Sequence, residues 1–168
     1  MIEIIKNVNN ISSLEVNNII TRVKALIVTS NKKILLGHSF CEYQFPGGHV
    51  ENNEALLPAL KRELLEETGL LYDTENLEVF ARLTKYFKDY PKNGVNTKLE
   101  IYYYVIKDDR IPILSNTNYT DEEVDGNFSL RYIPLDIVKC VIKDNIKICG
   151  DAEGIAEEML EVLDYFIK

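Results

Sequence analysis

Apolar runs separated by turn-forming residues divide the first third of the chain into predicted strands. Isoleucines within residues 2–5 predict a short strand, and a polar connection follows it to residue 20. Two apolar runs on either side of a Ser-Asn-Lys turn predict a hairpin over residues 21–39. Residues 43–54 contain a Pro-Gly-Gly sequence and predict a loop rich in turns.

An amphipathic helix is predicted over residues 55–68. Leu56, Leu60 and Leu64 recur at every fourth position, so they fall on one side of a helix. Gly69 follows the last helical residue, where a glycine commonly ends a helix.

The rest of the chain alternates between further predicted strands and helices. The strands are expected over residues 77–90, 96–108 and 128–135, and the helices over residues 135–147 and 152–167. Residues 89–96 predict a turn-rich loop between the first two strands, and residues 118–127 predict an acidic loop before the third. This order predicts an α+β fold, a mixed sheet packed by helices, with residues 1–168 as a single domain.

Composition and charge narrow the functional classes. The 168 residues are 46% hydrophobic and 27% charged, which is typical of a globular protein. The net charge of -8 argues against a nucleic acid polymer as partner, because such binding depends on clustered positive charge. The chain shows no secretory signal and no apolar run approaching 18 residues. We therefore expect a cytoplasmic protein that does not enter a membrane.

The three cysteines predict neither a disulfide framework nor a thiolate zinc site. Cys41, Cys140 and Cys149 are odd in number, and no two of them have C-x-x-C spacing. Reduced thiols in a cytosolic protein are the expected state.

Three glutamates on the predicted helix are the first indication of a functional site. Glu63, Glu66 and Glu67 share one helix face, where like charges repel, and they occupy the end of the helix that disfavours anions. One interpretation is a solvated acidic face softened by Lys61 and Arg62. The other is a site for a hard cation, because carboxylate oxygens suit Mg²⁺ or Mn²⁺.

The spacing of the charged and glycine positions is more specific than the charges alone. The pattern consists of Gly48, Glu54, the run Arg62-Glu63-Leu64, the pair Glu66-Glu67 and the pair Gly69-Leu70. It resembles the signature box of the Nudix hydrolases, the MutT-like family, at every specified position. Arg62 is expected to pair with Glu66 one turn away or to hold Glu54 across the loop.

The resemblance implies an α/β/α sandwich in which a loop-helix-loop holds divalent cations against a diphosphate. By position, Glu63, Glu66 and Glu67 are similar to the metal-binding carboxylates of the family, and the carbonyl of Gly48 or Gly47 is a further candidate ligand. Arg62 and Glu54 resemble the pair that orients the helix and loop. The implied reaction is hydrolysis of a nucleoside diphosphate linked to another group, with Mg²⁺ as the expected cation and Mn²⁺ as the alternative.

The family offers two choices for the carboxylate that accepts the proton of the attacking water. One is Glu63 in the helix. The other lies in the acidic loop, where Glu122 and Glu123 are candidates with Asp125 behind them. The competing interpretation of that loop is a solvated acidic turn.

Substrate-binding residues are less specific in the sequence. His49 is a candidate for touching a phosphate, and Tyr86 and Tyr103 are candidates for stacking on a base. An exposed loop position for the histidine, and packing within the sheet for the tyrosines, are the competing interpretations. ADP-ribose, nucleotide sugars, dinucleoside polyphosphates and noncanonical nucleoside triphosphates all stay open as substrates.

Two other classes share this fold and stay as alternatives. An isopentenyl-diphosphate-type isomerase would require further acid-base residues, and a non-catalytic nucleotide-sensing module commonly loses the box carboxylates, which this chain retains. Members of the family often pair, so a homodimer is one option for the assembly.

Overall fold

A mixed sheet lies at the centre of the protein in the computed structural model, which describes residues 1–151 and 154–167. The described strands are β1 (Ile2–Lys6), β2 (Asn18–Val28), β3 (Lys33–Ser39), β4 (Glu42–Gln44), β5 (Val79–Phe87), β6 (Thr97–Lys107) and β7 (Ser129–Pro134). They are ordered β1-β5-β6-β2-β3-β4, with β7 paired to the free side of β3. The β1–β5 and β2–β6 pairs are parallel, whereas β5–β6, β2–β3, β3–β4 and β3–β7 are antiparallel.

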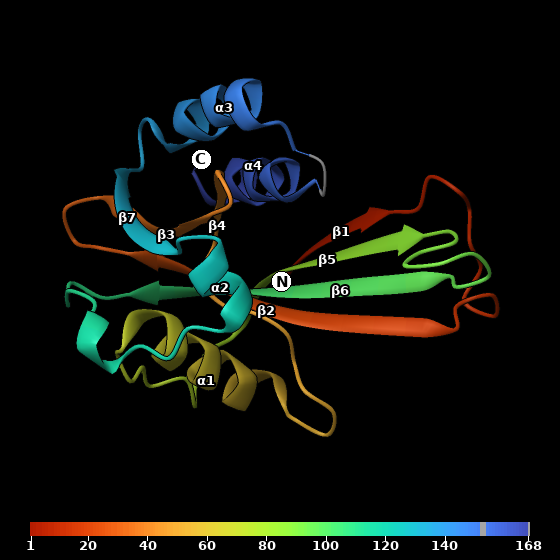
Figure 1. Ribbon diagram of the computed structural model, residues 1–168, viewed down its shortest axis with the longest axis horizontal. Helices are drawn as coiled ribbons and strands as arrows, with labels where there is room; N and C mark the ends of the chain where they lie inside the picture. Colours follow the sequence, from red (N-terminus) through yellow and green to blue (C-terminus); the bar gives the residue numbers. More distant parts are fainter. Residues whose placement is uncertain (152–153, 168) are drawn as a thin grey trace.

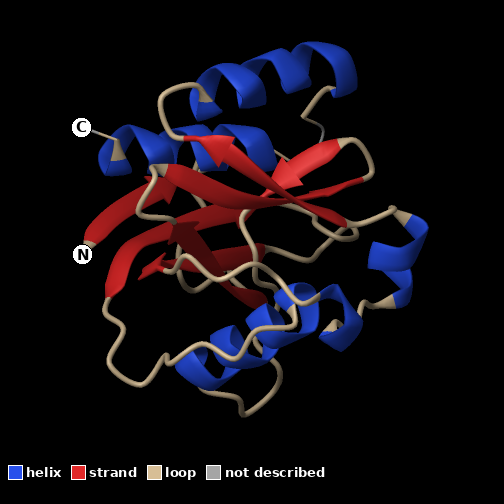
Figure 2. Ribbon diagram, turned by 90° about the vertical axis from the view of Figure 1, so that its left-hand side faces the viewer, coloured by secondary structure: helices blue, strands red, loops and turns tan. Residues whose placement is uncertain are grey.

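Helices cover both faces of this sheet, as Figures 1 and 2 show. The helices are α1 (Leu56–Thr68), α2 (Asp121–Asp125), α3 (Val138–Cys149) and α4 (Ile155–Phe166), together with the short 3-10 helix η1 (Leu114–Asn116). α1 lies on one face, and α3 and α4 lie on the other. None of the helices in the described part of the chain is long and apolar enough to cross a membrane.

Alternation along β2 produces a hydrophobic core on each face. Ala25 and Ile27 point to the core that contains Leu60 of α1, whereas Leu26 points to the core of α3 and α4. Fully burying one leucine side chain contributes about 1.5–3 kcal/mol, so both layers are stabilised by β2. The predicted α+β fold, an α/β/α sandwich with a mixed sheet, is confirmed.

The predicted elements agree with the structure except in the acidic loop and in two short segments. Residues 118–127 were expected to be a loop, but they contain α2, which Thr120 and Glu123 stabilise through a capping box. The three-residue strand β4 and the 3-10 helix η1 were not predicted, because neither is long enough to show a period. The predicted helix over residues 152–167 begins on residues 152–153, which lie outside the described residues.

The expectation of three reduced thiols is wrong in this structure. Cys41 and Cys149 form a disulfide with their Cα atoms 6.0 Å apart, although 108 positions separate them in the sequence. The fold brings the β3–β4 turn against the C-terminal end of α3, and that proximity does not follow from cysteine spacing. Cys140 is a free, exposed thiol.

We predict that Cys149→Ser lowers the free energy of unfolding by about 2–4 kcal/mol, because the disulfide closes a long loop and restricts the unfolded chain. Urea unfolding under non-reducing conditions measures this change. Cys140→Ser is the matched control and should leave the unfolding midpoint unchanged. Equal stability of the two variants would contradict a stabilising disulfide.

Candidate functional site

A segment of loop beside β2 forms one wall of the candidate site. β3 pairs with β2 only at Ile27 and Val28, and nearer the start of β2 residues 46–50 take its place. In this stretch Val23 N donates to Gly48 O at 2.9 Å, and Ala25 N donates to Pro46 O at 2.8 Å. The two glycines of the predicted loop are thereby held against the sheet.

The loop needs glycine because its backbone passes so close to its neighbours. Gly47 has φ 120°, a conformation that other residues rarely adopt, and a Cβ there would overlap the carbonyl oxygen of Val23. A Cβ on Gly48 would overlap the carboxylate of Glu63. The missing side chains therefore let α1 bring a carboxylate directly against the loop backbone.

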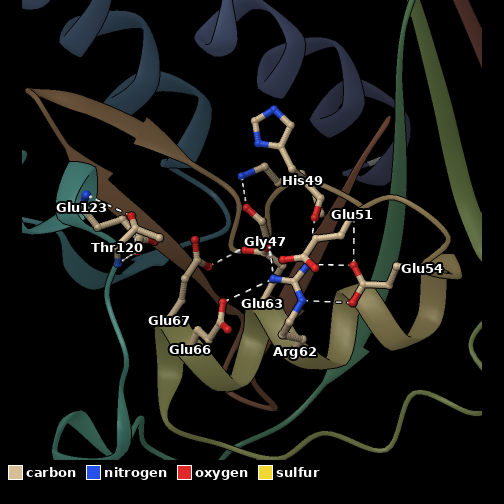
Figure 3. Close-up of polar contacts among 11 residues, drawn as sticks. Gly47, His49, Glu51, Glu54, Arg62, Glu63, Glu66, Glu67, Thr120 and Glu123 are labelled. Atoms are coloured by element: carbon tan, nitrogen blue, oxygen red, sulfur yellow. Dashed lines mark hydrogen bonds and ion pairs between the residues drawn. The ribbon is translucent and has the colours of Figure 1, made fainter. Parts of the chain in front are cut away.

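Arg62 connects the carboxylates of α1 to this loop (Figure 3). Its Nε and Nη2 donate to the two oxygens of Glu54 at 3.0 and 2.8 Å, and Nη2 also donates to the carbonyl of His49 at 3.0 Å. Its Nη1 lies 2.7 Å from Glu63 Oε1 and 3.4 Å from Glu66 Oε2. Both pairings predicted for Arg62, with Glu54 and with Glu66, are therefore present.

The Arg62–Glu54 pair is electrostatically reinforced. The hydrogen bond from Arg62 lowers the pKa of Glu54 below its ordinary value, and the same bond raises the pKa of Arg62. Glu54 Oε2 also accepts from Glu51 N at 3.0 Å, so the carboxylate ties the loop to the helix through side chain and backbone.

Glu67 is the most buried of the three helix carboxylates, with 3% of its surface exposed. Its Oε2 accepts a hydrogen bond from Gly47 N at 2.7 Å. Burial raises the pKa of Glu67 to about 8, although the nearby charge of Lys24 and the Gly47 N–H oppose that shift. Burial also raises the pKa of Glu63 and lowers that of Lys24.

Lys24 projects from β2 and binds the opposite side of the loop. Its Nζ donates to the carbonyl of Gly47, and it lies 3.3 Å from Gln44 Oε1. The carbonyls of Gly47 and Gly48 thus each accept one hydrogen bond, from Lys24 and from Val23. A carbonyl oxygen has two lone pairs, so each of these two keeps acceptor capacity for a further partner.

These groups line a cleft of about 720 Å³, within the range of small-molecule sites. Among the described residues, the cationic side chains in its lining are those of Arg22, Lys24 and Arg62. Seven of the described glutamates line the same cleft, so carboxyl groups outnumber cationic groups there.

The donor set fits a hard divalent cation in its chemistry, because it consists of carboxylate and carbonyl oxygens. Within residues 1–151 and 154–167, no three His, Cys, Asp or Glu side chains converge into a ready-made cage. Mg²⁺ does not require such a cage, because it commonly uses one or two carboxylates and completes its shell with water and phosphate oxygens.

The acidic helix α2 forms the far wall of the cleft, where both Glu122 and Glu123 contribute to the lining. The capping box consists of Thr120 N donating to Glu123 Oε2 at 2.7 Å and Glu123 N donating to Thr120 Oγ1 at 3.3 Å. The Thr120 hydroxyl also donates to Glu123 Oε2 at 2.9 Å. The Glu123 carboxylate also acts on Glu67, whose pKa it helps to raise. The structure therefore brings the acidic segment and the helix carboxylates to one cavity.

The three predicted substrate-binding residues lie in different environments. His49 lines the cleft, and Arg22 Nε donates to its Nε2 at 3.2 Å. Tyr103 is only 2% exposed and packs edge-on against Phe45 in the core, so its ring offers no surface to a base. Tyr86 lies on β5 and does not line the cleft. The assignment of Tyr103 to base stacking is therefore wrong in this conformation.

Sequence reasoning missed Lys24, Arg22 and Phe40, which all line the cleft. For the first two, a signal was present: Arg22 and Lys24 are two positions apart in a predicted strand, so they share one face. Phe40 had no such signal, because a lone phenylalanine at a strand end is ordinary.

Comparisons with known proteins match this chain to one protein family. The NUDIX domain profile matches residues 20–147. The chain is 37% identical over 65 residues to 8-oxo-dGTP diphosphatase of Buchnera aphidicola, covering 39% of this chain and 45% of the relative. It is 32% identical over 133 residues to m7GpppN-mRNA hydrolase NUDT17 of Danio rerio, covering 73% of this chain and 40% of the relative.

A solved structure supports the fold. The MutT protein of Methanosarcina mazei Go1 superposes with a TM-score of 0.57 at 18% identity, covering 90% of this chain and 96% of that one. The match to each of the two sequence relatives spans less than half of that relative's length. Since the profile match covers most of the chain and includes the loop, α1 and the far wall of the cleft, the protein belongs to the Nudix family.

Proposed function

We propose that this protein is a divalent-cation-dependent hydrolase of a diphosphate linkage in a nucleotide or nucleotide derivative. The observation that carries the proposal is the meeting of Glu63, Glu66 and Glu67 with the Gly47–Gly48 backbone in one cleft. Arg62 stabilises this arrangement. We further propose that residues 1–168 act as one domain, because both cores share the same central sheet.

The proposed reaction gives roles to the carboxylates of α1, to the loop carbonyls and to Arg62. Glu63, Glu66 and Glu67, with the carbonyl of Gly47 or Gly48, would hold Mg²⁺ or Mn²⁺. The bound cation supplies charge neutralisation at the phosphates and a more acidic water. Arg62 binds the carboxylates of Glu54, Glu63 and Glu66, so it would orient two of the three proposed ligands and connect them to the loop.

Two carboxylates are candidates for accepting the proton of the attacking water. Glu63 lies against Gly48 with one oxygen bound to Arg62. Glu122 lines the opposite wall, and its charge acts on His49. We favour Glu122 over Glu123 on the α2 side, because the Glu123 carboxylate already caps the helix.

The proposed substrate class is supported by what the names of the two relatives share. One relative is named for 8-oxo-dGTP and the other for capped mRNA, and both substrates carry a base on a chain of phosphates. The net charge of -8 favours a small substrate over a polymer for this chain. We therefore propose a small nucleotide-type substrate, with ADP-ribose, nucleotide sugars, dinucleoside polyphosphates and noncanonical nucleoside triphosphates as the first compounds to test.

We predict metal-dependent phosphate release from at least one compound of that panel, because the site lacks enough cationic side chains to neutralise a diphosphate alone. The assay follows phosphate release with Mg²⁺ or Mn²⁺, adding a phosphatase where the first product is a monoester. EDTA should abolish the signal, and restored Mg²⁺ should return it. If no compound of the panel releases phosphate while the protein still binds metal, the result would argue for a nucleotide-sensing module instead.

Glu66→Gln and Glu67→Gln should each lower kcat by about 100-fold or more while the protein stays folded, because each removes a charged oxygen from the proposed metal site. Glu75→Gln, in an exposed loop, is the matched control and should keep wild-type turnover. Circular dichroism checks the fold of each variant. Near-wild-type rates in both helix variants at saturating Mg²⁺ would refute the metal assignment.

Arg62→Lys should lower kcat by about 10- to 100-fold, because lysine cannot hold both oxygens of Glu54 while it neutralises Glu63. The free energy of unfolding should fall by about 1–3 kcal/mol through the loss of charged hydrogen bonds. Steady-state kinetics and urea unfolding measure the two effects. Lys61→Arg on the same helix serves as the control, and a variant at Arg62 with intact kinetics would exclude the ordering role.

A further inference from the structure

The turn between β3 and β4 has an unusual residue at its tip. Ser39 pairs with Glu42, which leaves Phe40 and Cys41 as a two-residue hairpin loop. Both have positive φ, 46° and 73°, as a type I′ turn requires. Such turns strongly prefer Asn-Gly, because bulky side chains are disfavoured in the left-handed region. This chain instead places a phenylalanine and a disulfide-bonded cysteine there.

Three contacts from distant elements hold the turn in this conformation. Cys41 is bonded to Cys149 at the end of α3, and Asn145 Nδ2 donates to the carbonyl of Cys41 at 3.0 Å. The backbone N of Phe40 donates to Gly126 O at 3.0 Å. Strained backbone persists where surrounding structure over-determines it, and it is concentrated at ligand-binding sites.

The Phe40 ring lies beside Gly126, yet the ring is open to solvent. A Cβ on Gly126 would overlap Ser39 Oγ and come within 2.7 Å of two carbons of the Phe40 ring, so the glycine leaves room for both side chains. Phe40 is nevertheless 60% exposed, and it lines the same cleft as Glu63, Glu66 and Glu67. Neither backbone preference nor core packing explains a phenylalanine here.

We infer that Phe40 is the platform on which the base of the substrate stacks. The inference rests on the proposed function, because it needs the diphosphate of the same substrate at the carboxylates. An exposed ring on a fixed backbone suits this role, since little order must be gained when a base binds. Stacking on a phenyl ring tolerates any base, because every base has a π face.

Titration calorimetry in Mg²⁺ with ADP, GDP and inorganic pyrophosphate tests the inference without requiring turnover. Phe40→Asn suits the left-handed backbone and removes the ring, whereas Phe40→Tyr keeps the ring. We expect Phe40→Asn to raise the Kd of ADP and GDP about tenfold or more, and Phe40→Tyr to stay within about twofold of wild type. The Kd of pyrophosphate should be unchanged in both variants, and the thermal midpoint of Phe40→Asn should be no lower than that of wild type.

Ile148→Asn is the control for loss of an exposed apolar side chain, because Ile148 is 81% exposed and does not line the cleft. It should bind all three compounds as the wild type does. An unchanged Kd for ADP and GDP in Phe40→Asn would overturn the inference. A parallel loss of pyrophosphate binding would also overturn it, since the residue would then act on the whole site.

The outcome is separable from that of the proposed function. If the wild type hydrolyses nothing but binds ADP and GDP through Phe40, the hydrolase proposal fails and the inference holds. If the wild type hydrolyses a nucleotide and Phe40→Asn binds ADP and GDP normally, the inference fails and the hydrolase proposal holds. No binding of either nucleotide by the wild type overturns the inference.

Discussion

The repulsion among carboxylates on one face of α1 is the constraint on which the rest of the site depends. Like charges one turn apart destabilise a helix, and here they also lie at the end of α1 where anions are disfavoured. Arg62 offsets the repulsion by binding Glu54, Glu63 and Glu66 together, and the buried Glu67 is held instead by the Gly47 N–H and by the field of Lys24. Groups of the loop and of β2 therefore stabilise charges that would otherwise destabilise α1, and the helix, loop and strand depend on one another electrostatically.

The sheet makes that arrangement possible by leaving a gap beside β2. Because β3 pairs with β2 over only two residues, the remaining edge of β2 is open to the loop over residues 46–50. The two glycines then let the loop backbone approach both β2 and α1, which side chains would prevent. The β3–β4 turn lies beyond the short β2–β3 pairing and contributes Ser39 and Phe40 to the lining of the same cleft. The proposed diphosphate site and the proposed base site therefore both lie in segments that follow the end of that pairing.

Much of the fold and of the carboxylate site could be predicted from local sequence. The spacing of Leu56, Leu60 and Leu64 indicates both α1 and its buried face, and the glutamates are placed by the same period. Contacts that depend on tertiary approach could not be predicted in this way: the pairing of Cys41 with Cys149 spans 108 positions. The helix α2 was missed for a different reason, because its five residues are too few to show a helical period, although its Thr120–Glu123 capping box is a local signal in the sequence. Tyr103 was a candidate for base stacking in the sequence because strand alternation does not say which face of the sheet is covered by α4.

Phe40 illustrates why the two halves of the site differ in how readily sequence reveals them. A metal site for a diphosphate needs several charged groups at fixed spacing, and such a set leaves a pattern on a helix. A stacking surface needs only one ring, and a single phenylalanine is unremarkable until its backbone conformation and exposure are known. In this protein the unusual feature is the combination of a left-handed phenylalanine, a disulfide beside it and a glycine beneath its ring. Each of these features is restrictive alone, and together they place an exposed aromatic ring in the lining of a charged cleft, where it can contribute to binding and adds little to folding.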